Sequence, residues 1–427
     1  MQLDDDVLAV PATRRPSEVV TQSAIGMAAG RAASMALGFL FWLAAARFFS
    51  PLVVGATAGL VSSMMLCTQF AQFGIGNALI IELPKSAGQE RHLVSVALWW
   101  TVAAALGTAL VFLVLGASVL QEVGESVTTP VAALAFLVMC VLGTANIVMD
   151  QTSMALGRGA QVLTRNLSFG AVAALGLLAI RGMTTEPRPV SLLWAWVAAG
   201  VTACAMGLWQ FHAVLPRIKG VSLSKREASA RIWGTGLANQ ALTLAERAPT
   251  LVLPIVVVEV LGTRANAAWY PAWMIAWGVY IIPMSVGMAL FSGVADDGRV
   301  RVKAVASAMR TSLLIGGAAA LAVLALAQLL LSVLGKGYAE EGTVVVRLLV
   351  LGFVPLTLVQ MYFGVCRGIS RIWEATAVAA ISGIAGVVLA AVLGSTRGLV
   401  GFAWGWLAAL VAAGLWSAVR LMMVVER

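Results

Sequence analysis

Long apolar stretches alternate with short polar segments along almost the whole of this 427-residue chain. A helix needs ~20 mostly apolar residues to cross the ~30 Å hydrocarbon core of a bilayer. Within that core the backbone must satisfy its own hydrogen bonds, so helices are the simplest spanning element. The stretches that meet this requirement are 22–46, 53–81, 93–117, 130–154, 166–181, 191–213, 232–260, 266–294, 311–334, 343–366, 373–394 and 398–419. The pattern predicts an all-α polytopic membrane protein with about 12 transmembrane helices.

The segments between these spans carry unequal shares of positive charge. If the N-terminus is cytoplasmic, 19 Lys and Arg residues fall on the cytoplasmic side and 7 on the outer side. Because positive residues accumulate in cytoplasmic loops, we expect a multi-pass protein of the bacterial plasma (inner) membrane with both termini cytoplasmic. The net charge of +9 then fits anionic lipid head groups. The basic residues are spread over short segments, so we expect no nucleic-acid partner.

A faint internal repeat divides the chain into two halves. Ala155–Gln161 resembles Gly364–Ser370 at an offset of 209 positions, and Gly76–Leu79 resembles Gly287–Leu290 at an offset of 211. Each unit holds six spans, an even number, so both units have the same orientation, as in the parallel repeats of many transporters. We therefore expect two six-helix parallel pseudo-repeats around a central cavity. The predicted regions are a disordered cytoplasmic tail (1–21), an N-terminal six-helix lobe (22–213), a basic cytoplasmic linker (214–231) and a C-terminal six-helix lobe (232–422).

Charged side chains occur near the middle of the first predicted span of each half. Arg31 lies in the first span, and Glu246 and Arg247 lie in the seventh. A charge at a span centre costs ~2.5–3.5 kcal/mol on insertion scales, so such residues mark a function or a buried partner. These residues either line a cavity that receives an anionic substrate or form an ion pair, such as Arg31 with Glu246, that only joins helices. Glu246 is also a candidate for coupling to H+ or Na+.

Uncharged polar side chains accompany these charges in the second and seventh spans. They suit a water-filled cavity or interhelical hydrogen bonds equally well. The candidate substrate-binding residues are therefore Arg31, Arg247, Gln69, Gln72, Asn77, Asn239 and Gln240. Asp150, near the inner end of the fourth span, is a second candidate for ion coupling, and its alternative is an ion pair with Arg158.

The sequence shows no constellation for catalysis. His92 and His212 lie near span ends without a partner at metal-ligand spacing, and the four cysteines sit singly in separate spans. A Gly-rich phosphate loop with Lys is absent, which argues against ATP hydrolysis. The first outer loop, Arg47–Pro51, lacks the acidic residue that a polytopic sugar transferase would want. We therefore expect no catalytic residue, no metal site, and no cofactor beyond a coupling ion. A tryptophan stripe at Trp269, Trp273 and Trp277 favours packing or lipid contact over sugar stacking.

Several short motifs resemble those of bacterial polysaccharide flippases. Ala46–Gly55 is similar to the turn after their first helix, and Phe73–Leu79 to the end of their second. Leu334–Glu341 resembles the outer loop before their tenth helix, while Leu348–Pro355 and Arg367–Arg371 resemble that helix and its inner turn. Each motif is short, and the resemblance that they carry covers nearly the whole chain. The family is the polysaccharide transporter (O-antigen flippase) branch of the multidrug/oligosaccharidyl-lipid/polysaccharide (MOP) exporter superfamily.

The resemblance implies an alternating-access flippase that moves polyprenyl-pyrophosphate-linked oligosaccharide from the cytoplasmic to the outer leaflet, coupled to an ion. The implied partners are the lipid-linked glycan, the lipid bilayer, and a glycan polymerase or glycosyltransferases. The chain departs from the family pattern at Val53-Val54, which replaces an acidic-Phe pair, and at Asn266–Trp269, which replaces a Gly-containing turn. Twelve spans argue against the fourteen-span lipid II type. The alternatives are a multidrug/cation antiporter of the same superfamily and a non-transporting membrane scaffold.

Overall fold

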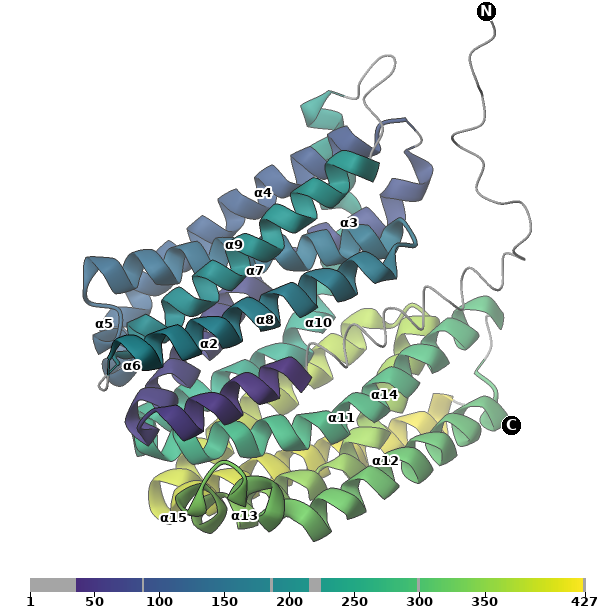
Figure 1. The fold of residues 1–427 in the computed structure, drawn as a ribbon. Coiled ribbons are helices and arrows are strands. Elements are labelled where there is room, and N and C mark those ends of the chain that lie inside the picture. The colour runs from purple at the N-terminus through teal and green to yellow at the C-terminus, as the bar shows by residue number, and fades with distance from the viewer. Residues whose placement is uncertain (1–35, 87, 185–186, 215–223, 298–299, 425–427) are drawn as a thin grey trace, which may run out of the picture.

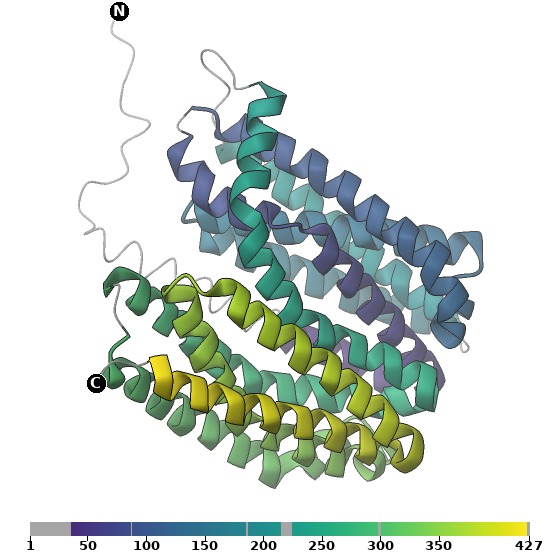
Figure 2. The same cartoon turned by 180° about the vertical axis from the view of Figure 1, so that it is seen from behind.

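The computed structural model describes residues 36–86, 88–184, 187–214, 224–297 and 300–424. The predicted tail, Arg31 and half of the predicted linker (215–223) lie outside these ranges. All regular elements of the described residues are helices. Figures 1 and 2 show them gathered into two bundles that lie side by side, with the first half of the chain in one bundle and most of the second half in the other.

The first half begins with a helix described over Ala36–Phe48. It continues with α2 (Pro51–Ala71), α3 (Ile75–Glu82), the 3-10 turn η1 (Leu83–Lys85), α4 (Glu90–Val111), the π-helical turn η2 (Phe112–Gly116), α5 (Ala117–Val119), α6 (Gln121–Glu125), α7 (Pro130–Ala155), α8 (Gly159–Met183) and α9 (Pro189–Val214). The second half comprises α10 (Lys225–Leu261), α11 (Thr263–Asp297), α12 (Val302–Ser332), α13 (Lys336–Leu351), α14 (Phe353–Gly368) and α15 (Ile372–Val424).

Ten helical stretches of the described residues are long and apolar enough to cross a membrane, with α13 and α14 together forming one of them (Lys336–Gly368). The segment labelled α15 holds two spans. The backbone of Gly398 takes a φ of 63° and reverses the chain between them. Ala36–Phe48 is a shorter apolar helix that continues the first predicted span. Twelve spans therefore result, six in each half, and the predicted fold class is confirmed.

Three of the described helices, α2, α7 and α10, begin where a hydroxyl side chain caps the first turn. Ser50 and Thr129 cap α2 and α7, and a proline at the first helical position follows each of them. Ser224 and Glu227 form a reciprocal capping box at the start of α10. Hydrogen bonds from the backbone amide and hydroxyl of Ser224 lower the pKa of the Glu227 carboxyl. These local signals explain why the helices start at the predicted boundaries or close to them.

The two halves repeat one another, but the offset between them is not the same everywhere. At the end of α7 the amide of Arg158 donates to the Ser153 carbonyl (2.8 Å), and after α14 the amide of Arg371 donates to the Cys366 carbonyl (2.8 Å). This shared turn relates the halves by 213 positions. Gly76 lies against Gln151 and Gly287 lies against Gln360, and these pairs are related by the sequence-based offsets of 211 and 209. The register of the repeat therefore differs by about one helical turn between the two places.

Candidate functional site

The boundary between the two bundles follows one face of α10. Gln240 donates from Nε2 to the carbonyl of Gln69 on α2 (3.0 Å), and further along α10 Val258 packs against Gly59. Arg247 lies seven residues after Gln240 and eleven before Val258. These spacings place the three residues on the same face of α10. Unlike the side chains at either contact, Arg247 is exposed. We infer that its guanidinium projects into the space between α10 and the N-terminal bundle.

The neighbouring residue, Glu246, points to the other side of α10 and toward α14. Its carboxylate accepts a hydrogen bond from Arg367 Nη2 (2.6 Å) and a longer one from Gln360 Nε2 (3.3 Å). The Glu246 and Arg367 side chains are only 8% and 10% exposed, respectively, so the pair is close to fully buried. Arg367 also reaches the sulfur of Met288 on α11 (3.3 Å). The ion pair thus ties together the helices of the C-terminal bundle beside the boundary.

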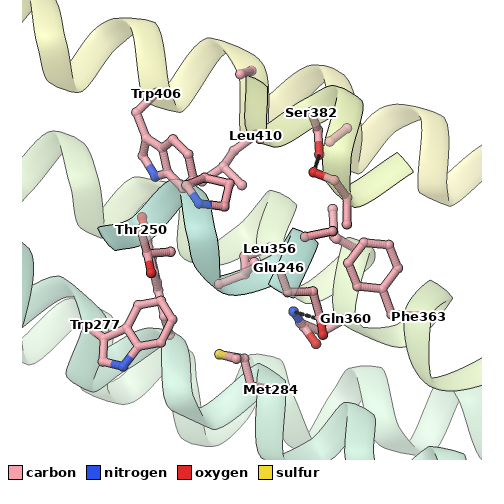
Figure 3. A pocket seen from close by; sticks show the side chains of 18 residues that line it. Glu246, Thr250, Trp277, Met284, Leu356, Gln360, Phe363, Ser382, Trp406 and Leu410 are labelled. Atoms are coloured by element: carbon pink, nitrogen blue, oxygen red, sulfur yellow. Dashed lines mark hydrogen bonds between the residues drawn. The ribbon is translucent and has the colours of Figure 1, made fainter. Parts of the chain in front are cut away.

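A small cavity with a volume of about 60 Å³ lies next to this carboxylate, between α10, α11, α14 and α15 (Figure 3). Its polar lining includes Glu246, Gln360, Thr250 and Ser382, and its aromatic lining includes Trp277, Tyr280, Phe363 and Trp406. A single water needs on the order of 10–15 Å³. The cavity therefore has room for a few waters or a hydrated cation beside Glu246.

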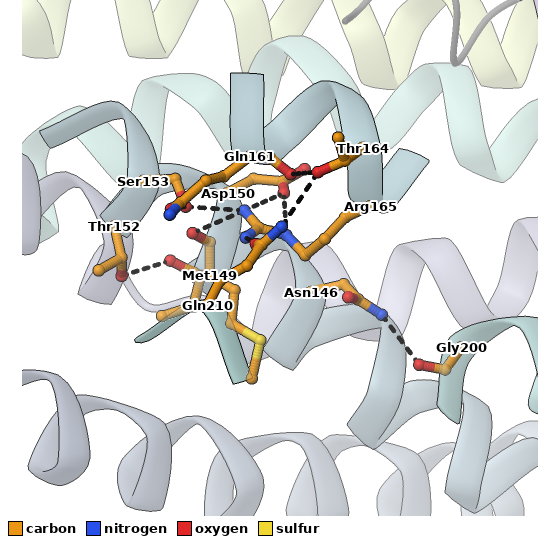
Figure 4. Close-up of polar contacts among 11 residues, drawn as sticks. Asn146, Met149, Asp150, Thr152, Ser153, Gln161, Thr164, Arg165, Gly200 and Gln210 are labelled. Atoms are coloured by element: carbon orange, nitrogen blue, oxygen red, sulfur yellow. Dashed lines mark hydrogen bonds and ion pairs between the residues drawn. The ribbon is translucent and has the colours of Figure 1, made fainter. Parts of the chain in front are cut away.

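Asp150 lies in a separate polar cluster inside the N-terminal bundle (Figure 4). Its Oδ1 accepts hydrogen bonds from Arg165 Nε (3.1 Å) and Nη2 (2.8 Å). Arg165, on α8, is 1% exposed and also donates to Gln210 on α9 and to the hydroxyl of Ser153 (2.9 Å). One guanidinium therefore joins α7, α8 and α9. The sequence-based alternative to ion coupling at Asp150 was an ion pair with Arg158, and Arg165 was not singled out as a partner.

The C-terminal bundle contains a comparable cluster built from different residues. Glu374, at the start of α15, accepts hydrogen bonds from Tyr362 of α14 (2.9 Å) and from Arg420 near the end of α15 (Nε, 2.9 Å). In each half, therefore, an ion pair joins the last three spans. The arginine of the pair is Arg165, on the second of these spans, in the N-terminal half, and Arg420, on the third, in the C-terminal half.

The bundles also meet at the end that the loop charges assign to the outside. There α2 and α11 approach until their backbones touch, and a Cβ atom added to Gly55 would overlap the carbonyl of Thr263. Asn266, which is fully buried, donates from Nδ2 to the carbonyl of Gly55 (2.9 Å). This contact leaves no room for a side chain at position 55, so the halves are closed at this point.

The remaining predicted site residues are placed as follows. Gln69, in the last turn of α2, and Gln72, which follows the helix directly, are buried, and Asn77 is half-buried on α3. Asn239 lies in α10, but its side chain is not among the described ones, and Arg31 lies outside the described residues. Of the predicted site residues, the structure thus brings Gln69 and Gln240 together. Arg367 and Gln360, which were not predicted site residues, are the hydrogen-bond partners of Glu246.

The tryptophan stripe of α11 packs inside the C-terminal bundle. Trp269 and Trp273 are stacked with ring centroids 5.9 Å apart, and both are buried. Phe402 and Trp406 of α15 meet these rings edge to face, at 5.5 Å in each case. Such pairs stabilise a helix interface, so the stripe serves packing here, as the sequence analysis favoured.

No family model and no curated protein sequence matches this chain. Several solved structures match its fold. A multidrug resistance MATE family transporter of the MOP superfamily, in an inward-facing conformation, is 15% identical with a TM-score of 0.70, covering 92% of this chain and 94% of that one. The lipid II flippase MurJ, in an inward closed conformation, is 11% identical with a TM-score of 0.72, covering 93% and 87%.

A third match is a MOP superfamily transporter from Pyrococcus furiosus whose binding pocket is described as having reverse polarity. It is 13% identical with a TM-score of 0.65, and the match covers 96% of this chain and 98% of that one. All three comparisons cover at least 92% of this chain, so each includes most of both bundles. The protein therefore has the fold of the multidrug/oligosaccharidyl-lipid/polysaccharide superfamily of transporters and flippases.

Proposed function

We propose that this protein is an alternating-access flippase for polyprenyl-pyrophosphate-linked oligosaccharide, a precursor of cell-surface polysaccharide. One observation carries the proposal: the charge balance at the boundary between the bundles. Glu246 is paired with Arg367, so the adjacent Arg247 leaves the group of three with a net positive charge. A permanently charged planar guanidinium suits a pyrophosphate, which it can bind through two parallel hydrogen bonds.

The ion pair also suggests how transport is coupled to an ion. When Glu246 takes up a proton, or holds Na+ at the adjacent cavity, its attraction for Arg367 falls. The Arg367 guanidinium is then available to the pyrophosphate together with Arg247. By reciprocity, substrate that binds Arg367 favours uptake of the ion at Glu246. In this scheme Arg367 exchanges one anionic partner for another, and no buried charge stays uncompensated.

A multidrug antiporter is the second candidate, because a MATE family transporter shares the fold. Cationic drugs favour a binding surface dominated by acids. At this boundary, by contrast, the acid Glu246 already has a cationic partner, and the exposed side chain beside it is an arginine. The described charges therefore fit an anionic cargo better.

Arg247→Ala, expressed in cells that lack the chromosomal copy, tests the proposal. We expect surface polysaccharide to fall and lipid-linked oligosaccharide to accumulate in the inner leaflet. Arg226→Ala is the matched control, since Arg226 is an exposed arginine on the same helix before its apolar part. Normal polysaccharide in Arg247→Ala cells, at wild-type protein levels, would exclude the proposed substrate contact. Loss of resistance to cationic drugs on deletion, with unchanged polysaccharide, would favour the antiporter.

A further inference from the structure

A second, larger hollow lies between the last turns of α11 and the first turns of α12. It has a volume of about 520 Å³ and shares no residue with the cavity beside Glu246. Arg301 lies at its mouth, where α12 begins, and Ser307 and Thr311 follow along α12. Leu290 and Val294 of α11 form part of the opposite wall. We refer to this hollow as the α11–α12 groove.

The groove is polar along α12 and apolar along α11. Arg301 precedes the ninth predicted span, 311–334, whereas Leu290 and Val294 fall inside the eighth, 266–294. An occupant that fills the groove must therefore combine a polar end near Arg301 with an apolar part that continues along Leu290. A soluble anion would satisfy only the first requirement.

The described charges beside the groove are positive. Lys303, Ser307 and Arg310 are spaced four and three residues apart, so they share one face of α12. All three are exposed, and Ser307 lines the groove, so the two cations border it. None of the described residues that line the groove is acidic. The loop charges assign this end of the molecule to the cytoplasm, where anionic lipids attract basic residues next to a span.

We propose that the α11–α12 groove binds an anionic phospholipid of the cytoplasmic leaflet. Arg301 holds the head-group phosphate, with Lys303 nearby, and the hydroxyls of Ser307 and Thr311 meet the glycerol ester region. One acyl chain then lies along the apolar wall formed by α11. The site depends on the orientation inferred from the loop charges. It is independent of the substrate proposed above, because neither Arg247 nor Arg367 takes part.

Native mass spectrometry of the full-length protein in detergent tests the site with two lipids, dioleoyl phosphatidylglycerol and dioleoyl phosphatidylcholine. We expect one phosphatidylglycerol to be retained at concentrations where phosphatidylcholine is lost. Arg301→Gln removes a hydrogen bond to a charged group, and the apparent affinity for phosphatidylglycerol should fall roughly tenfold. Arg301 is exposed, so the substitution should leave the fold intact, and the unfolding temperature checks this.

Two further variants separate the groove from general surface charge. Ala304→Trp fills the groove without changing charge and should also abolish retention of phosphatidylglycerol. Arg158→Gln removes an exposed arginine at the same end of the N-terminal bundle and should have no effect. Equal losses in Arg301→Gln and Arg158→Gln, or full retention in Ala304→Trp, would overturn the proposal. So would equal retention of the two lipids, or complete displacement of the lipid by inorganic phosphate.

Discussion

Glu259, in the last turn of α10, caps the start of α6 in the opposite half through the backbone amide of Val123. The distance from the Val123 nitrogen to Oε1 is 2.9 Å, and the two preceding amides donate to Oε2 at 2.9 and 3.3 Å. A carboxylate at a helix start is favoured by hydrogen bonding and by the helix dipole. The contact lies at the same end as Gly55 and crosses between the halves, so opening of that end must break it.

We therefore expect Glu259→Ala to shift the protein toward a state open at that end. Hydrogen bonds to a charged group contribute about 1.5–3 kcal/mol, which corresponds to a tenfold or larger change in population. Spin labels at Thr128→Cys and Arg264→Cys, both exposed, report the separation by double electron–electron resonance. Glu125→Ala, at an exposed carboxylate on α6 itself, is the control. A distance distribution that Glu259→Ala leaves unaltered would show that the contact does not hold the end closed.

The ion pair beside the boundary gives a second prediction. Glu246→Gln keeps the side-chain shape and removes the charge that Arg367 pairs with, so transport should lose its dependence on pH or Na+. Measurement of lipid-linked glycan flipping in proteoliposomes across a pH and a Na+ gradient checks this. Glu341→Gln, at an exposed acid outside the cavity, should behave as wild type. If Glu246→Gln transports with the wild-type ion dependence, Glu246 is not the coupling residue.

The cluster around Arg165 should contribute to stability. Asp150→Asn leaves a guanidinium that is 1% exposed without its charged partner, and breaking a buried pair costs about 3–5 kcal/mol. We expect a clear fall in the unfolding temperature of the purified protein. The double variant Asp150→Asn/Arg165→Met should recover part of the loss, whereas Arg158→Met should change little. A single variant as stable as wild type would show that the pair is not structural, and would strengthen Asp150 as an ion-coupling candidate.

The orientation of the protein in the membrane can be tested by labelling introduced cysteines. All four native cysteines are buried, so background labelling should be low. Arg226→Cys introduces an exposed thiol at the start of α10, and Ser332→Cys does so at the end of α12. A membrane-impermeant maleimide applied to intact cells should label Ser332→Cys only. After the membrane is permeabilised, both variants should be labelled. Labelling of Arg226→Cys in intact cells would reverse the proposed orientation.

The spans could be predicted because each depends on local sequence, such as the apolar run that begins after the Ser50 cap. The ion-pair partner of Glu246 could not be predicted from the sequence. Arg367 lies 121 positions away, and its place in the last turn of α14 made it look like a solvated residue at a span end. Which charges meet depends on how separate helices rotate against one another, and the periodicity within each helix does not determine that.

The backbone contact at Gly55 has an evolutionary consequence. Position 55 admits only glycine because a Cβ atom there would overlap the Thr263 carbonyl, and the Asn266 side chain donates to the Gly55 carbonyl in the same close approach, so a substitution at either position alters the other's surroundings. Asn266 also begins the segment in which this chain departs from the polysaccharide transporter pattern. In relatives that keep the close contact between α2 and α11, positions 55 and 266 should therefore co-vary. A glycine followed 211 positions later by an asparagine would then help identify homologues whose overall sequence similarity is too low to detect.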